Sequence, residues 1–180
     1  MQKKILSDMQ CPVARSLERV GEWWSILILR EAFYGSKRFD EFQKRLDIAT
    51  NMLSRRLTVL VAEGLLERRQ YCEKPPRYEY VLTPLGVDFR PVILTLLDWG
   101  NKHFEPEGVS AQLTDVATGT PVDLILVDRN TGKPISLEDH AVLPGPAASE
   151  RLRQRLTRAP RPTEVHASPA APIAPDAATI

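Results

Sequence analysis

Apolar residues recur at helical spacing through the first hundred positions, in segments that glycine and proline separate. Pro12 stands where a first helical turn begins, and Leu17 and Val20 follow it on one apolar stripe. The next segment, 23–34, is almost wholly apolar and ends before Gly35. A helix that is apolar on all sides is typical of a protein interior, so this segment is predicted to be central and buried on most sides.

Two shorter helices follow at the spacing of a helix-turn-helix. The segment 39–46 carries apolar residues on one helical face, and a break of three residues comes after it. Thr50 is predicted to cap a second helix over 51–63, which Gly64 ends. The predicted buried face of this second helix consists of Leu53, Leu57, Leu60 and Val61. Two helices joined by such a short turn are typical of a helix-turn-helix.

A β-hairpin and a long apolar helix complete the predicted domain. Segments 65–71 and 78–83 are rich in aromatic and branched residues, and the Pro-Pro pair between them favours a stiff tip. Thr83 followed by proline predicts a helix start, and apolar residues continue at helical spacing to position 104. Because Pro91 falls inside this pattern, we expect a kink or a break there.

These elements predict a mainly α protein with a small β-wing (α+β), which is the architecture of a winged helix-turn-helix. Residues 1–104 form this domain in our interpretation. Residues 105–150 form a small acidic extension with a β-hairpin, whose turn places Asn130 and Gly132 at positive φ. Residues 151–180 are expected to be partly helical and then a disordered tail rich in proline and alanine.

The charge of the chain changes along its length. A net charge of +1 over 180 residues gives by itself no reason to expect nucleic acid. Residues 1–104 nevertheless hold 17 Lys and Arg against 13 Asp and Glu, whereas 105–145 hold 2 against 7. A basic first part therefore precedes an acidic extension.

The polar face of the second helix has the chemistry that reads duplex DNA. An α-helix fits the major groove, where Asn pairs with adenine and Arg with guanine, while Ser and Thr reach bases or phosphates. Basic residues on the wing suit phosphates or the minor groove. The candidate DNA-binding residues are Thr50, Asn51, Ser54, Arg55, Arg56 and Thr58 on the helix, and Arg68, Arg69, Lys74 and Arg77 on the wing.

Two other interpretations of the same residues stay open. A leucine stripe with arginines opposite it is also what a solvated amphipathic helix shows. Winged helices also serve as protein-docking modules, and the acidic segment 105–145 is a candidate to recruit a partner protein. The combination of turn spacing, basic hairpin and long apolar helix favours DNA binding over both.

Residues 11–104 resemble the HxlR-type family of bacterial winged-helix transcriptional regulators. The matching stretches are CPVARSLERVGEWWSILILREAFYGSKRFDEFQKRL, NMLSRRLTVLVAEGLLERR and YCEKPPRYEYVLTPLG, with LDWG at the end. The resemblance implies a non-enzymatic homodimer, joined by its terminal helices, that binds an inverted-repeat operator in double-stranded DNA. The dimer also has a rationale in the residues, because helices 23–34 and 84–104 are more apolar than a domain of this size can cover.

Few other residues are candidates for chemistry. Cys11 matches the N-terminal cysteine that senses oxidants or electrophiles in some members of the family; the alternative is a small buried residue at the dimer interface. Cys72 on the wing is interpreted as incidental. Trp23 and Trp24 could stack on a small-molecule effector, although two tryptophans in an apolar helix are more often core or interface.

The sequence predicts no enzyme, no cofactor, no metal site and no membrane segment. His103, His140 and His166 are far apart in the sequence and lack Cys or carboxylate partners at ligand spacing. Nucleotide-binding and hydrolase motifs are missing. Two isolated cysteines favour a reducing compartment, and the N-terminus lacks an apolar export signal, so we expect a cytoplasmic protein.

Overall fold

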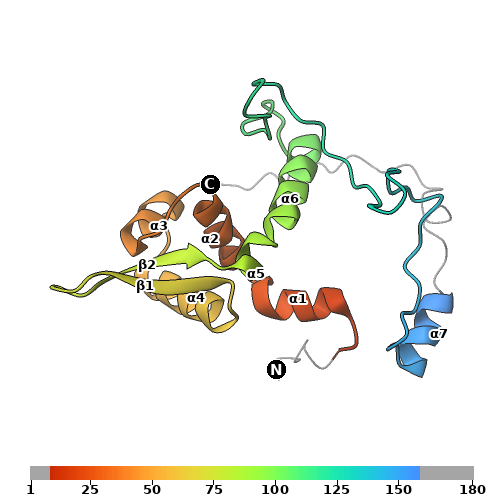
Figure 1. Cartoon of the computed structure of the whole chain (residues 1–180), viewed down its shortest axis with the longest axis horizontal. Coiled ribbons are helices and arrows are strands. Elements are labelled where there is room, and N and C mark those ends of the chain that lie inside the picture. The colour runs from red at the N-terminus through yellow and green to blue at the C-terminus, as the bar shows by residue number, and fades with distance from the viewer. Residues whose placement is uncertain (1–8, 159–180) are drawn as a thin grey trace, which may run out of the picture. The chain divides into compact units, whose positions relative to one another are not determined.

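The computed structural model describes residues 9–158. The chain divides into two compact units, with the boundary between Leu124 and Ile125. The first unit contains α1 (Pro12–Val20), α2 (Trp23–Phe33), α3 (Phe39–Leu46), α4 (Thr50–Ala62), β1 (Leu66–Cys72), β2 (Arg77–Leu82), α5 (Pro84–Val87) and α6 (Arg90–His103) (Figure 1). The second unit contains α7 (Glu150–Arg158). This order confirms the mainly α fold with a two-stranded wing, while the domain boundaries at 104 and 150 stay a prediction.

The core of the first unit is built by α2, α3 and α4 and is closed by the start of β1. Its fully buried side chains include Ile28, Leu29, Phe42, Leu53, Leu57, Leu60 and Leu66. The predicted leucine face of α4 is therefore confirmed, with Val61 half-buried at its edge. Each such side chain contributes about 1.5–3 kcal/mol through burial, so the rotation of α4 about its axis is fixed.

Helix α2 is central, but its ends are not buried. Ser25, Ile28, Leu29 and Glu31 are buried, whereas Trp23 is 72% exposed and Tyr34 55%. The prediction that the helix is buried on most sides is thus wrong at its two ends, because its neighbours cover only the middle turns. The buried Glu31 carboxylate is neutralised by Arg30 at 2.8 Å and by Arg45 at 3.7 Å.

The turn between α3 and α4 differs from the sequence prediction at Thr50. Asp47 takes the left-handed conformation (φ +48°) after α3, and Ala49 is the residue that precedes α4. Thr50 is the first helical residue, and its Oγ1 accepts a hydrogen bond from Gln43 Nε2 at 2.8 Å. The prediction that Thr50 caps the helix is therefore wrong, because α3 engages its hydroxyl.

The wing is an antiparallel hairpin in which Leu66 pairs with Leu82 and Gln70 with Tyr78. Its second strand is also tied to the segment before α3, because the Tyr80 N–H donates to the Lys37 carbonyl at 2.7 Å. The predicted hairpin is confirmed, with each strand shifted by about one residue. The hydrogen bond between Tyr80 and Lys37 also joins the wing to the helix-turn-helix.

A tight joint links the wing to α6. Thr83 caps α5 as predicted: its Oγ1 accepts from the Gly86 N–H at 3.1 Å and donates to the Gly64 carbonyl at 2.5 Å. The long helix predicted over 84–104 breaks as expected, since α5 ends at Val87 and Pro91 lies in the first turn of α6. Gly86 is buried in this joint against the Leu65 carbonyl.

The extension reverses direction where a hairpin was predicted, but it pairs at a single bridge, Val127 with Pro134. Gly132 has φ +70°, whereas Asn130 has no positive φ, which corrects that part of the turn prediction. The reason is that the Asn130 N–H donates to Asp128 Oδ1 at 3.0 Å and holds an ordinary turn. Helix α7 confirms the helical segment, and the predicted tail at 159–180 lies outside the described residues.

We expect Gly86→Ala to destabilise the protein by about 1–3 kcal/mol, the usual cost of forcing a methyl group into packed space. A Cβ at this position would collide with the Leu65 carbonyl and press on the Leu82 side chain. Urea unfolding followed by circular dichroism measures the loss. Gly145→Ala is the control, because a Cβ there meets open space. Equal unfolding midpoints for the two variants would contradict the joint described above.

We expect Glu41→Gln to lower the melting temperature at pH 7, with a difference from the wild type that shrinks below about pH 4. The pKa of Glu41 is lowered, mainly because the carboxylate accepts the backbone N–H groups of Lys37 at 2.8 Å and Arg38 at 3.0 Å. A lowered folded-state pKa stabilises the protein above the ordinary value of 4.5 and loses that effect as pH falls through the folded value.

The control for this experiment is Asp40→Asn, which removes a neighbouring carboxylate that lies 3.8 Å from Arg38. Its effect should be smaller at every pH, because Asp40 is the more exposed of the two carboxylates that Arg38 contacts. A Glu41→Gln difference that does not change with pH would refute the role of the carboxylate charge.

Candidate nucleic-acid interface

The exposed face of α4 carries five of the six candidate residues on this helix. Thr50, Asn51, Ser54, Arg55 and Thr58 are all exposed. They lie opposite the buried leucines, so the packing of α4 on the core decides which of its polar groups reach solvent. Arg55 has no carboxylate within ion-pair distance anywhere in residues 9–158, and its charge is therefore available to a partner.

The polar groups of this face are partly held by local hydrogen bonds. Thr58 Oγ1 donates to the Ser54 carbonyl at 2.9 Å, and Asn51 Oδ1 accepts from the Met52 N–H at 2.7 Å. The Asn51 amide nitrogen can still donate outward. Arg55 is thus the strongest donor that this face presents.

Arg56 lies elsewhere than the sequence predicted. It was predicted among the DNA-binding residues of the polar face, but the residue is only 7% exposed, and its Nη2 pairs with Glu22 Oε1 at 3.0 Å. The prediction for Arg56 is wrong because the residue lies one turn before Leu60, within the arc of α4 that packs on the core. Glu22 supplies its charge partner there. The guanidinium Nε lacks a hydrogen-bond partner among the described residues.

The wing presents the other four candidates, and all four are exposed. The Arg68 guanidinium stacks over the Tyr78 ring at 3.5 Å, and Arg69 pairs with Glu67 at 2.9 Å. Lys74 and Arg77 flank the tip of the hairpin, and neither has an ion-pair carboxylate within residues 9–158. The tip therefore carries the freest positive charge of the wing.

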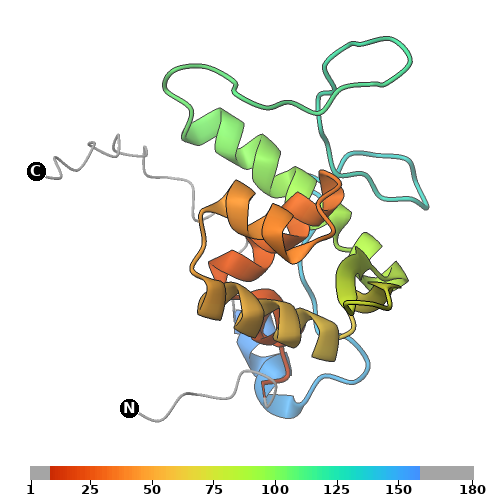
Figure 2. The same ribbon diagram turned by 90° about the vertical axis from the view of Figure 1, so that its left-hand side faces the viewer.

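The two groups of candidates belong to elements on one side of the first unit. In Figure 2, α3 and α4 face the viewer and the wing beside them is seen nearly end-on. Two α3 residues that the sequence analysis did not select join this side: Lys44, which is exposed, and Gln43, which contacts Thr50. The cluster of basic residues in the last turn of α3 is the sequence signal that could have identified Lys44.

The cysteines are separate features of the first unit. Cys11 is the residue before α1, is half-buried and is a free thiol. The side chain of Arg15, in the first turn of α1, donates from Nε to the Met9 carbonyl at 3.0 Å. Cys72 is also free, with its Sγ 3.7 Å from the Lys74 carbonyl.

The two adjacent tryptophans of α2 have different surroundings. Their rings meet edge to face with centroids 6.1 Å apart. Trp24 packs against the core, as the core interpretation predicts, whereas Trp23 projects into solvent. The pair therefore does not enclose a slot for an aromatic ligand.

Apolar side chains also remain exposed on the terminal helices of the first unit. On α1 these are Val13 and Leu17, and on α6 they are Val92, Leu96 and Trp99, each between 42% and 66% exposed. The α6 residues are spaced four and three positions apart, so they form one strip along the helix.

Metal-binding groups and membrane helices are not found in the part of the chain that the structure describes. No cluster of three His, Cys, Asp or Glu side chains is arranged to hold an ion there. His140 accepts a hydrogen bond from the Ser136 N–H at 3.2 Å, and the ring of His103 lies 5.9 Å from that of Trp99. No described helix combines the length and the hydropathy that a bilayer span requires.

Comparisons with known proteins agree with this fold. The HxlR-like helix-turn-helix family matches residues 19–108. The uncharacterized HTH-type transcriptional regulator Rv3095 of Mycobacterium tuberculosis strain H37Rv is 39% identical over 141 residues, which are 78% of this chain and 89% of that protein. The uncharacterized HTH-type transcriptional regulator YdeP of Bacillus subtilis strain 168 is 39% identical over 52% of this chain and 73% of its own.

Two solved structures extend the likeness beyond the winged helix. PA1374 of Pseudomonas aeruginosa, assigned as a transcription factor, is 54% identical with a TM-score of 0.59, covering 81% of this chain and 100% of its own. PA1607, likewise assigned as a transcription factor, is 37% identical with a TM-score of 0.69, covering 76% and 96%. Regulators of this kind are not enzymes. From the order of its elements, the polar face of α4 and these matches, we conclude that the chain belongs to the HxlR-like helix-turn-helix family.

Proposed function

We propose that this DNA-binding transcriptional regulator acts in the cytoplasm as a homodimer that recognises an inverted-repeat operator. The observation that carries the proposal is the exposed polar face of α4, with an unpaired Arg55 at its centre and a basic wing beside it. An exposed helix face of this chemistry fits the major groove of B-DNA.

The residues proposed to read bases are those on the first turns of α4. Arg55 is long enough for a bidentate contact to guanine, and Asn51 has an amide that can pair with adenine. Thr50, Ser54 and Thr58 have short side chains, which suit contacts to phosphates or to the nearest bases. Arg56 is assigned a positioning role, since its buried pair with Glu22 connects α4 to the residue before α2.

The residues proposed to bind the DNA backbone lie on the wing and on α3. Lys74 and Arg77 at the tip need no ion pair broken before they meet a phosphate, whereas Arg69 must leave Glu67. Arg68 is fixed over Tyr78, which holds its guanidinium in one orientation. Lys44 adds a charge on the same side. Contacts of this kind set the position of the protein on the duplex more than they select sequence.

The homodimer is supported by the apolar residues that remain exposed on α1 and α6. A two-fold arrangement would bury them and place two α4 helices on one side of the duplex. Half-sites must then lie about one DNA turn apart, roughly 34 Å. A signal that alters the packing of the terminal helices would change this spacing. Cys11, the residue before α1 and two positions before Val13, is positioned for such a signal from an oxidant, an electrophile or another small-molecule effector.

A gel-shift titration with a palindrome selected from random duplexes tests the function. We expect a specific complex that weakens steeply with salt, with a log–log slope near −0.9 for each phosphate neutralised. Arg77→Ala should weaken binding to all sequences alike and make the slope less steep by about one. Binding that ignores both sequence and salt would contradict the proposal and favour a protein-docking module.

The adjacent arginines of α4 provide a matched pair of variants. Arg55→Ala should leave the melting temperature unchanged and reduce operator affinity by about 1–3 kcal/mol, because an exposed group that contacts a base is removed. Arg56→Ala should lower the melting temperature, because Glu22 loses its partner and a buried side chain is deleted. Thermal melts and gel shifts on both variants give the comparison.

The two arginine variants separate recognition from folding. If Arg55→Ala retains full discrimination between operator and random DNA, this arginine does not read a base. If Arg56→Ala loses operator affinity with an unchanged melting temperature, the buried position of Arg56 is not its position on DNA.

A further inference from the structure

The extension contains one sequence pattern twice. Residues 113–124 (LTDVATGTPVDL) and 126–137 (LVDRNTGKPISL) share Leu, Asp, Thr, Gly, Pro and a final Leu at the same places, with Val122 matched by Ile135. Only Ile125 separates the two copies. Identity at six of twelve positions with a constant offset is the signature of a tandem repeat.

The two copies also fold alike. In each, the aspartate carbonyl accepts from the glycine N–H, at 2.8 Å from Gly119 and 2.7 Å from Gly132. These glycines have φ +71° and +70°. The aspartate side chains, Asp115 and Asp128, accept hydrogen bonds from the turn that follows, which lowers the pKa of both carboxyl groups. Each copy is therefore a hairpin turn that equivalent hydrogen bonds stabilise.

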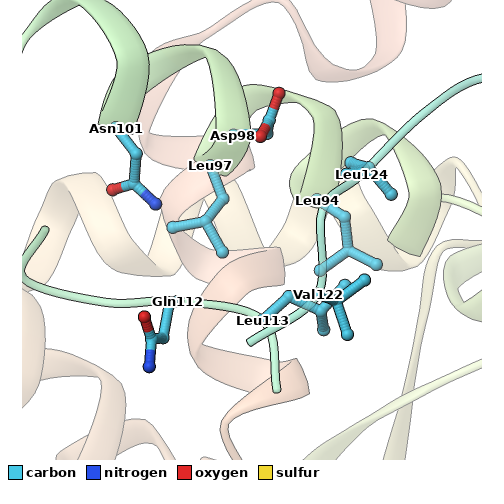
Figure 3. Close-up of a pocket in the computed structure, with 8 residues that line it drawn as sticks. All are labelled: Leu94, Leu97, Asp98, Asn101, Gln112, Leu113, Val122 and Leu124. Atoms are coloured by element: carbon cyan, nitrogen blue, oxygen red, sulfur yellow. The ribbon is translucent and has the colours of Figure 1, made fainter. Parts of the chain in front are cut away.

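The first hairpin shows what the shared apolar residues do. Leu113, Val122 and Leu124 lie against Leu94 and Leu97 of α6, as Figure 3 shows. At the end of this contact the Asn101 side-chain amide donates to the Ala111 carbonyl at 2.8 Å. The hairpin thus covers a strip of α6 formed by Leu94, Leu97 and Asn101.

The second hairpin has apolar side chains at the same three places, and all three are exposed. Leu126, Ile135 and Leu137 occupy the places of Leu113, Val122 and Leu124. They are 60%, 44% and 53% exposed, whereas Leu113 and Leu124 are part-buried; Val122 is 42% exposed, so the two copies differ in exposure at their leucine positions. In the first copy, the equivalent residues pack on α6 residues that are three or four positions apart. The triad of the second copy is therefore suited to an apolar strip of the same spacing on a helix.

An uncovered strip of that kind exists on α6 itself. Val92, Leu96 and Trp99 are 46%, 42% and 53% exposed. Successive helical residues are about 100° apart, so this strip lies on the side of α6 opposite to Leu94, Leu97 and Asn101. Each chain therefore offers one open triad and one open strip.

We infer that the second hairpin, residues 126–137, docks through Leu126, Ile135 and Leu137 on the Val92, Leu96 and Trp99 strip of a second copy of this chain. The second hairpin cannot cover the strip on α6 of its own chain. The first hairpin lies on one side of α6, and only Ile125 joins the two hairpins. This linker spans about 3.5 Å, whereas a helix with side chains is about 10–12 Å across.

Symmetry supports a second copy as the occupant. A two-fold axis would pair the open triad of each chain with the open strip of the other. The inference rests on the proposed homodimer and adds that the extension, and not only the terminal helices, joins the two subunits.

Cysteine cross-linking of the full chain tests this contact. In a C11S/C72S background, one tagged chain carries Leu96→Cys and a differently tagged chain carries Ile135→Cys, and the two are co-expressed and oxidised with diamide. We expect a covalent heterodimer that needs both cysteines. Leu94→Cys paired with Ile135→Cys is the matched control, because the first hairpin already covers Leu94; it should not cross-link.

Three outcomes would overturn the inference. Leu96→Cys chains that cross-link to each other would mean that the α6 strips pair directly. A chain with both cysteines that closes on itself would place the hairpin on its own subunit. A dimer by light scattering that forms no Leu96–Ile135 cross-link would leave the homodimer standing and remove only the hairpin contact, whereas a monomeric wild type would overturn the homodimer as well.

A second measurement does not depend on cysteine chemistry. The double variant L126S/L137S should raise the dissociation constant of the dimer at least about tenfold, measured by analytical ultracentrifugation. Val116→Ser at the tip of the first hairpin is the control, since Val116 is fully exposed and outside both triads; it should leave the dissociation constant unchanged. Equal dissociation constants for the double variant and the control would also overturn the inference.

Discussion

The burial of one leucine stripe on α4 is the constraint on which the rest of the structure depends. Leu53, Leu57 and Leu60 have no exposed surface, and they are held by Ile28, Leu29 and Phe42 from the two preceding helices. A rotation of α4 by one residue position would expose leucine and bury charge, at a cost of several kcal/mol. The polar face that meets DNA in our proposal is therefore a consequence of core packing, and its local sequence decides only which bases it can contact.

The leucine periodicity was sufficient to predict this face, but it could not place every residue on it. Arg55 and Arg56 look equivalent as residue types, and the helical period alone puts Arg56 near the boundary of the stripe. Its burial depends on Glu22, which is 34 positions earlier in the chain and becomes a neighbour only after folding. The same limit explains Thr50, whose hydroxyl belongs to Gln43 of the preceding helix instead of to a cap. Long-range partners of polar groups are what sequence patterns do not contain.

The extension shows the opposite case, in which the signal was present in the sequence and a local analysis did not use it. The turn at Asp128 was predicted from Asn and Gly, whereas its twin at Asp115 lacks an Asn-Gly pair and was not predicted. A comparison of the chain with itself would have found both, because Leu, Asp, Thr, Gly and Pro recur thirteen residues apart. The repeat also changes the interpretation of the acidic segment, because its first hairpin covers a strip of α6 and its second has apolar residues at the same places.

Helix α6 connects these features because its sides differ in what they contact, and one of them is open. Ile93 is buried toward the core, Leu94 and Leu97 carry the first hairpin, and Leu96 lies on the open strip. Its start is fixed to the base of the wing, because Thr83 and Gly86 hold α5 against the carbonyl groups of Gly64 and Leu65. A subunit that docks on the open strip in the proposed homodimer would therefore contact an element that α5 joins to the base of the wing. The distance between the two wings of that homodimer would then depend on how the partner packs on α6, so a signal that alters this packing would change DNA binding without touching α4.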